Sequence, residues 1–129
     1  MNETYPLSLP TKEFQVAVKN IHKLLSKIKP QLNYPILEVL VKLESVELRL
    51  IAMSLIINCK HKNIYSFTIP FHDFYAAAIG TDEETFIAKV SSGEITIGNR
   101  SLSSDNIKLF HPENLQKFDL SINCRALDI

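Results

Sequence analysis

Hydrophobic residues in the first part of the chain recur with two different periods. Residues 5–9 alternate in the manner of a short strand, and Thr11 follows Pro10 at the position expected for a helix N-cap. From Phe14 onward the period is that of one buried helical stripe, and Pro30 ends the helix because the residue before a proline is pushed out of helical geometry. The predicted stripe consists of Phe14, Ala17, Val18, Ile21, Leu24, Leu25 and Ile28.

The pattern then changes to strands, interrupted by one more helix. Segments 36–43, 46–59 and 64–69 are rich in Val, Ile and Leu or alternate cleanly, which predicts three strands. After Pro70, the apolar residues of 71–79 have helical spacing, and Gly80 marks the end of a short helix. Residues 86–90, 94–97 and 101 onward predict three more strands joined by turn residues.

This order predicts an α+β fold made of two near-equivalent halves, each a helix followed by three strands, with two helices packed on antiparallel sheet. No tandem repeat or low-complexity segment interrupts it. A domain over 4–110 and a C-terminal tail over 111–129 are expected, which fits one core for a chain of 129 residues.

The polar face of the first helix carries a stripe of lysines. Lys12, Lys19 and Lys23 fall within roughly 40° of one another at about 100° per residue, and Lys27 lies slightly to the side. Such a stripe is either a solvated helix face or a site for a polyanion. We keep both interpretations open.

The net charge of zero is a cancellation between two unlike halves. Residues 1–62 hold nine basic and five acidic residues, a net charge of +4, so residues 63–129 carry −4. This distribution favours charged partners or head-to-tail self-association. A neutral total therefore does not exclude nucleic acid.

Four strings of residues follow one another in a fixed order from Thr4 to Phe110. They are Asn33-Tyr34-Pro35-Ile36-Leu37, the alternating strand Val46 to Ala52, Phe67-Thr68-Ile69-Pro70-Phe71-His72-Asp73-Phe74, and Ile95 to Ser101 after Gly80. Their order and spacing resemble one domain of the bacterial DNA polymerase processivity clamp, the beta subunit, also called the sliding clamp.

The resemblance implies a non-catalytic protein whose helices face DNA while its strands form the outer sheet. Carried over by position, Lys12, Lys19, Lys23 and Lys27 become the DNA-binding residues, meeting phosphates without reading sequence. The implied partners are duplex DNA, replication or repair proteins, and further copies of the chain in an oligomer. Phosphate contacts of this kind make binding depend on salt.

The sequence departs from that family at three points. The chain holds one such domain, so encircling DNA requires several copies. The second helix offers His72 and Asp73 but no Lys or Arg, and the ending Cys124 to Ile129 does not match the peptide-binding C-terminus of the family. We assign no peptide-binding residues.

The tail contains one more predicted strand. Phe118, Leu120, Ile122 and Cys124 alternate with polar residues, and this strand must pair with its own sheet or a neighbouring subunit, or remain an open edge.

Other chemistry has little support in the sequence. No nucleophile elbow, phosphate loop or zinc-protease motif is present, so we expect no enzyme, and Cys59 and His61 are too close in sequence for a usual metal pair. We expect no cofactor, no membrane span and a cytoplasmic location. The alternative to a DNA clamp is a protein-interaction module on the same scaffold with no DNA role.

Overall fold

The computed structural model describes residues 4–27, 35–50 and 53–110, in which two helices and nine strands form an α+β fold with two antiparallel sheets. The elements in chain order are β1 (Tyr5–Pro10), α1 (Thr11–Lys27), β2 (Ile36–Val41), β3 (Ser45–Leu50), β4 (Met53–Asn58), β5 (Tyr65–Pro70), α2 (Phe71–Ile79), β6 (Thr85–Ser91), β7 (Glu94–Ile97), β8 (Arg100–Ser103) and β9 (Lys108–Phe110).

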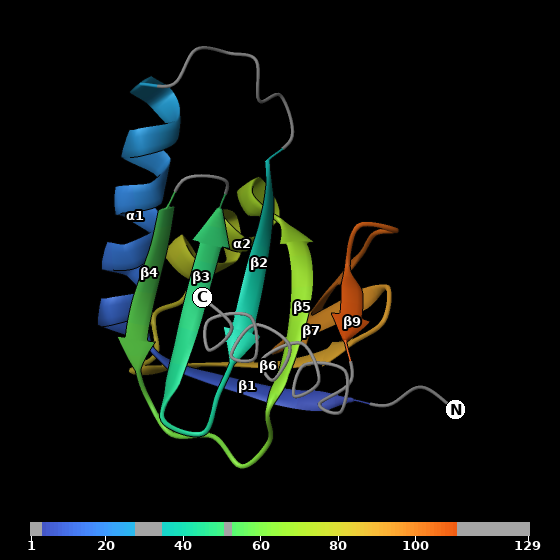
Figure 1. Cartoon of the computed structure of the whole chain (residues 1–129). Coiled ribbons are helices and arrows are strands. Elements are labelled where there is room, and N and C mark those ends of the chain that lie inside the picture. Colours follow the sequence, from blue (N-terminus) through green and yellow to red (C-terminus); the bar gives the residue numbers. More distant parts are fainter. Residues whose placement is uncertain (1–3, 28–34, 51–52, 111–129) are drawn as a thin grey trace, which may run out of the picture.

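The two sheets differ in size, and the helices pack against each other beside them. One sheet has the order β4-β3-β2-β5-β9 and the other has the order β1-β6-β7-β8. Figure 1 shows α2 behind the five-stranded sheet and α1 alongside its β4 edge. A single apolar cluster joins both sheets and both helices, and it includes the fully buried rings of Phe14, Phe67, Phe71 and Phe74.

The two halves of the chain exchange their opening strands. Elements β1-α1-β2-β3-β4 form the first half and β5-α2-β6-β7-β8 the second, yet β1 pairs with β6 of the second half and β5 pairs with β2 of the first. The registers of these two pairings match. Pro10 lies opposite Thr85 at the first residue of β6, and Pro70 lies opposite Ile36 at the first residue of β2.

The strand-to-helix junctions are equivalent as well. The amide of Thr11, first residue of α1, donates to the carbonyl of Glu84 at 2.9 Å, and the amide of Phe71, first residue of α2, donates to the carbonyl of Pro35 at 2.9 Å. Each acceptor directly precedes the strand that pairs with the junction. The same hydrogen bond thus sets the angle at which each helix leaves its sheet.

Once the structure aligns the two junctions, the sequence reveals a weak internal repeat. Residues 7–18 read LSLPTKEFQVAV and residues 67–78 read FTIPFHDFYAAA, which share Pro, Phe and Ala and exchange Ser for Thr, Leu for Ile and Glu for Asp. The sequence of buried, half-buried and exposed positions is identical in the two segments. The match is too short and too degenerate to stand out in the sequence alone.

Equivalent aromatic residues meet each other in the core. The ring of Phe14 contacts the ring of Phe74 with centroids 4.9 Å apart, and Tyr5 stacks on Tyr65 at 4.8 Å. Both pairs join residues that occupy the same position in their own half. The approximate two-fold axis that relates the two halves therefore passes between the rings of each pair. Each half contributes side chains to the core of the other.

Two expectations about strands need correction. Segment 46–59 was predicted as one strand, but it forms β3 and β4, which pair antiparallel with Leu50 opposite Met53. Segment 64–69 was assigned to the first half, whereas β5 opens the second. The run Ile51-Ala52 carries none of the usual turn residues, so composition gave no sign of the reversal. The short strand β9, at the edge beside β5, was not predicted separately.

The expected N-cap at Thr11 is also wrong. Thr11 is the first residue of α1, and its buried Oγ1 has no hydrogen-bond partner among the described residues. The carbonyl of Glu84 satisfies the backbone amide instead. The ending of the helix before Pro30 and the strand predicted over 118–124 both lie outside the described residues.

A side chain of α1 fixes the end of α2. The Nε2 amide of Gln15 donates to the carbonyl of Ala78 at 2.9 Å and to that of Thr81 at 3.1 Å, while the Thr81 hydroxyl donates to the carbonyl of Ala77 at 2.8 Å. Gly80 ends the helix as predicted, but with a φ of −80° rather than a left-handed conformation. Side chains therefore satisfy carbonyls that the helix itself leaves open.

We expect Gln15→Ala to lower the free energy of unfolding by about 1–3 kcal/mol, because two hydrogen bonds worth about 0.5–1.5 kcal/mol each are lost. Urea denaturation followed by circular dichroism measures it. Asn20→Ala, at an exposed position of the same helix, is the matched control and should change stability by less than about 0.5 kcal/mol. Equal stability of the two variants would show that Gln15 does not hold the helices together.

Candidate nucleic-acid interface

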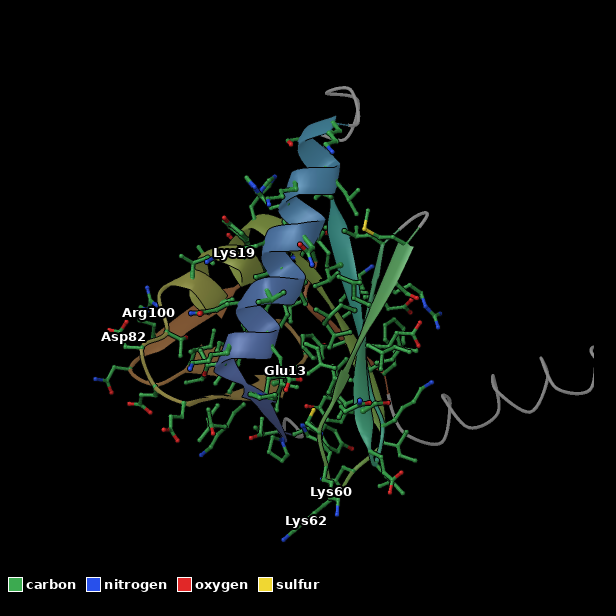
Figure 2. All side chains as sticks on the ribbon, turned by 90° about the vertical axis from the view of Figure 1, so that its left-hand side faces the viewer. Glu13, Lys19, Lys60, Lys62, Asp82 and Arg100 are labelled. Carbon is green, nitrogen blue, oxygen red and sulfur yellow. The ribbon has the colours of Figure 1, made fainter. Side chains whose placement is uncertain are left out.

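The four lysines predicted to bind DNA all lie on the exposed side of α1. Their positions face away from the buried stripe formed by Phe14, Ala17, Val18 and Ile21. Figure 2 shows α1 with its outer side toward the viewer and α2 beside it. We call the group of Lys12, Lys19, Lys23 and Lys27 the lysine face. The structure therefore confirms that the helix presents these residues together.

Three of these lysines stack with the same charge along one side of the helix. Lys19, Lys23 and Lys27 are spaced four residues apart, and like charges at this spacing destabilise a helix by about 0.2–0.5 kcal/mol per pair. Lys27 in the last turn interacts favourably with the helix dipole, which offsets part of this cost. The dipole does not account for Lys19, which lies near the middle of the helix.

Two other basic residues of the same half, Lys42 and Arg49, form ion pairs, in contrast to the lysine face. On the outer side of the five-stranded sheet, Arg49 contacts Glu47 at 3.2 Å and Glu38 at 3.6 Å, and Lys42 contacts Glu47 at 3.7 Å. Within the described ranges, no carboxylate lies within ion-pair distance of any of the four lysines. The positive charges of Lys42 and Arg49 are therefore neutralised, whereas those of the lysine face are not.

The positive charge is uneven along α1. The first turn holds Glu13, and the acidic loop of Asp82, Glu83 and Glu84 meets the start of the helix through the Thr11 to Glu84 hydrogen bond. Lys12 therefore shares its end of the helix with acidic residues, whereas the later turns carry only lysines as charged residues. The end of the helix from Lys19 onward is the more positive part.

A shallow groove of about 430 Å³ runs beside the two central lysines. Lys19 and Lys23 line it together with Val16, and the ring of His22 stacks on Tyr75 of α2 with centroids 4.5 Å apart. The stack holds α2 against the lysine-bearing turns of α1. This contact could not be predicted from the sequence, because the two rings come from different helices.

The second helix adds no positive charge to this surface. Its exposed residues include His72 and Asp73, and its last turn contains no basic residue. Its aromatic residues turn inward, since Phe71 and Phe74 are buried and Tyr75 is half-buried. Phosphate binding on this side of the molecule would rest on α1 alone.

Cys59 and His61 form a second cluster with nucleophilic or ligating atoms. The backbone amide of Ser8 donates to Nε2 of His61 at 3.1 Å, so the neutral ring carries its proton on Nδ1, which lies 4.0 Å from Sγ of Cys59. Burial raises the pKa of the Cys59 thiol, and the nearby Glu13 carboxylate raises it further. Burial lowers the pKa of His61, partly opposed by a hydrogen bond with the backbone of Cys59.

This geometry does not suit nucleophilic catalysis. A base must turn its lone pair toward the thiol, but the lone pair of His61 is taken up by Ser8, and the thiol donates weakly to the carbonyl of Ile57 at 3.7 Å. In the part of the chain that the structure describes, no three His, Cys, Asp or Glu side chains come together as metal ligands do. His61 instead accepts a hydrogen bond from the Ser8 amide, which lies on the open edge of β1.

Acid should weaken the fold through His61. The folded state holds this imidazole neutral, so the unfolded chain binds more protons as the pH falls below about 6.5, the ordinary pKa of histidine. We expect the free energy of unfolding to be highest above this pH and to fall between pH 7 and pH 5, as urea denaturation across this range would show.

The variant His61→Gln keeps a hydrogen-bond acceptor without titrating, and should reduce this slope. His72→Gln, at an exposed histidine, is the matched control and should retain it. An unchanged slope in His61→Gln would assign the acid sensitivity to other groups.

Comparisons with known proteins add no family to this picture. No protein-family model matches the chain, and no curated protein matches it. Among the described residues, neither helix is long and apolar enough to cross a membrane.

Proposed function

We propose that this chain is a sliding-clamp-like, non-catalytic protein that associates with duplex DNA independently of sequence through the lysine face of α1. The observation that carries the proposal is the stack of Lys19, Lys23 and Lys27 on an exposed helix side, with like charges at destabilising spacing and no carboxylate partner among the described residues. A phosphate backbone provides the missing negative charge.

Two further features support this proposal. Lysine is a point charge on a flexible stem, which suits movement along a phosphate backbone better than recognition of base edges. The duplicated order of one strand, one helix and three strands, with both helices side by side, is compatible with the resemblance to the processivity clamp drawn from the sequence. We place such a protein in the cytoplasm with the DNA, where it would tether replication or repair partners.

The DNA-binding role is tested by fluorescence anisotropy with a labelled duplex of arbitrary sequence. We expect binding at low salt, lost on addition of salt, and the double variant K19E/K23E should abolish it. Lys19→Gln with Lys23→Gln should reduce the slope of log K against log salt by about two, since each phosphate contact contributes about 0.9. Lys12→Glu should have a smaller effect, because Lys12 lies at the end of the helix that also carries Glu13 and meets the acidic loop.

The matched control is K60E/K62E, which changes the net charge by the same amount. Lys60 and Lys62 lie in the turn at the end of the molecule away from the later turns of α1, as Figure 2 shows. An equal loss of binding in this control, or no binding by the unaltered protein at low salt, would contradict the role of the lysine face. If the unaltered protein does not bind the duplex at low salt, the alternative is favoured, namely a protein-interaction module with no DNA role.

Encircling DNA requires several copies of the chain, and we propose that they associate through edge strands. In the described part of its sheet, β4 pairs only with β3, and its Ile56 side chain is 64% exposed. An apolar edge strand of this kind is prone to pairing with another chain.

Light scattering coupled to size exclusion should therefore give a mass of several chains that falls on dilution, and Ile56→Lys should shift it toward one chain. A mass of one chain at all concentrations would contradict ring assembly. It would not contradict DNA binding, which the anisotropy experiment tests.

A further inference from the structure

The two helices begin at equivalent residues but differ in length. Helix α1 has 17 residues and α2 has 9, so α2 stops about two turns short. In the first half, the extra turns carry Ile21, which is fully buried, and Leu25, which packs against the core. In the second half, the chain turns at Gly80, so no equivalent helical turns are present among the described residues.

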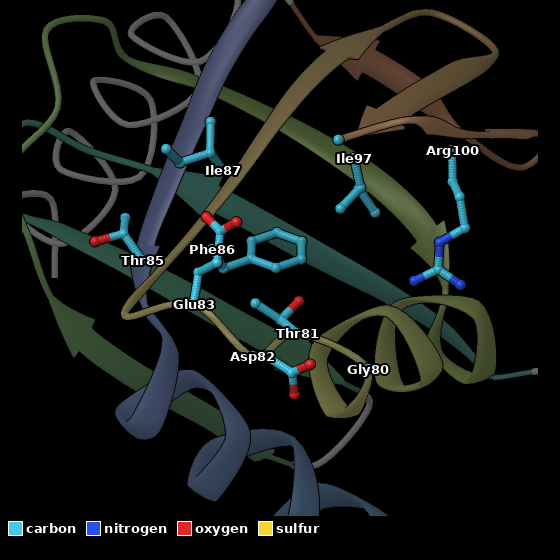
Figure 3. A pocket seen from close by; sticks show the side chains of 10 residues that line it. Gly80, Thr81, Asp82, Glu83, Thr85, Phe86, Ile87, Ile97 and Arg100 are labelled. Carbon is cyan, nitrogen blue, oxygen red and sulfur yellow. The ribbon is translucent and has the colours of Figure 1, made fainter.

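A hollow of about 380 Å³ lies at this position. Its floor is Phe86 and Ile97, its rim carries Ile87, Asp82 and Glu83, and Arg100 separates it from a smaller hollow beside α2. Figure 3 shows Phe86 between Thr81, at the end of α2, and Ile97 of β7. The Phe86 ring is itself buried in the core, where it packs on Phe14 and Phe74. By register, Phe86 corresponds to Leu37, and Ile97 and Arg100 correspond to Leu48 and Leu55 of the first half. We call this space the α2 hollow.

The walls of the α2 hollow are held in place without a ligand. Gln15 and Thr81 satisfy the last carbonyls of α2, so the helix end is fixed by hydrogen bonds. Arg100 lies over this end, with Nη2 3.5 Å from the position a β-carbon on Gly80 would take. A cation there is favourable, because the helix dipole is negative at its C-terminus.

The charge around the α2 hollow limits what can occupy it. Asp82 and Glu83 are exposed and form no ion pair with any described residue, and Arg100 does not come within ion-pair distance of them. The first half fills the same place with an apolar helical turn whose outer side bears lysines. A helix that is apolar on one side and basic on the next would bury its apolar side chains on Ile87 and Ile97, above the buried Phe86 ring, and would place a cation beside the two carboxylates.

We propose that the α2 hollow is a docking site for a short basic amphipathic helix of a partner protein, with two apolar residues four positions apart and a Lys or Arg on the next face. The bound helix supplies the turns that α2 lacks. This site lies apart from the lysine face and does not depend on DNA binding.

The sequence of α1 itself provides the probe. A synthetic peptide of residues 17–27, stapled between the positions of Asn20 and Leu24 to keep it helical, presents Ile21 and Leu25 together with three lysines. Titrated into isotope-labelled protein, it should shift the amide signals of Gly80, Thr81 and Gly98. The peptide with Ile21 and Leu25 replaced by Ser should leave them unchanged.

Charge-reversal variants test the rim. D82K/E83K should weaken peptide binding about tenfold or more, since a desolvated like-charge contact replaces an attraction. The matched control E44K/E94K reverses two exposed carboxylates elsewhere and should retain affinity, as should K19E/K23E. Ile87→Ser should weaken binding without unfolding the protein, because Ile87 is 60% exposed.

Three results would overturn the proposal. The first is the absence of shifts at millimolar peptide, or shifts centred on other elements. The second is equal binding of the serine peptide. The third is a shift of the same amides on dilution without peptide, which would assign the hollow to a second copy of the chain. The variant K19E/K23E should lose DNA binding but keep peptide binding. A negative result with the peptide therefore does not contradict the proposed DNA binding, which has its own experiment.

Discussion

The fold depends on the exchange of opening strands between the two halves of the chain. Strand β1 completes the sheet of the second half and β5 completes the sheet of the first, with matching registers and matching hydrogen bonds at the start of each helix. Neither half can close its sheet alone. The contact of Phe14 with Phe74 lies where the halves meet, so the core forms only when both are present. The two helices are consequently brought side by side.

Differences between the halves account for the candidate sites. The longer α1 extends beyond the junction and carries the lysine face over its later turns, while the shorter α2 leaves the α2 hollow. The β5 edge is covered by β9, whereas the equivalent edge of β1 is closed by side chains. There the Tyr65 hydroxyl donates to the carbonyl of Pro6 at 2.6 Å, and His61 accepts from Ser8. The equivalence of the two halves determines the arrangement of the sheets and helices. The lysine face and the α2 hollow both lie where the two halves differ.

Electrostatics divide the surface in the same way. On the five-stranded sheet, Arg49 forms ion pairs with Glu38 of the neighbouring strand and with Glu47 of its own strand. The later turns of α1 keep an open positive charge, and the loop after α2 keeps an open negative one. The neutral total of the chain is thus made of two surfaces of opposite sign, one suited to phosphates and one suited to a basic partner.

The sequence by itself determined the two helices, most strands, the aromatic core and the exposed placement of the lysines. These follow from local periodicity, because a side chain on a regular element points inward or outward according to its position alone. Only the tertiary structure decided the reversal between β3 and β4, the exchange of β1 and β5, the Gln15 contact with the end of α2 and the α2 hollow. Each of these features depends on contacts between residues that are distant in the chain. The local sequence of a segment does not show which distant segment it will pair with.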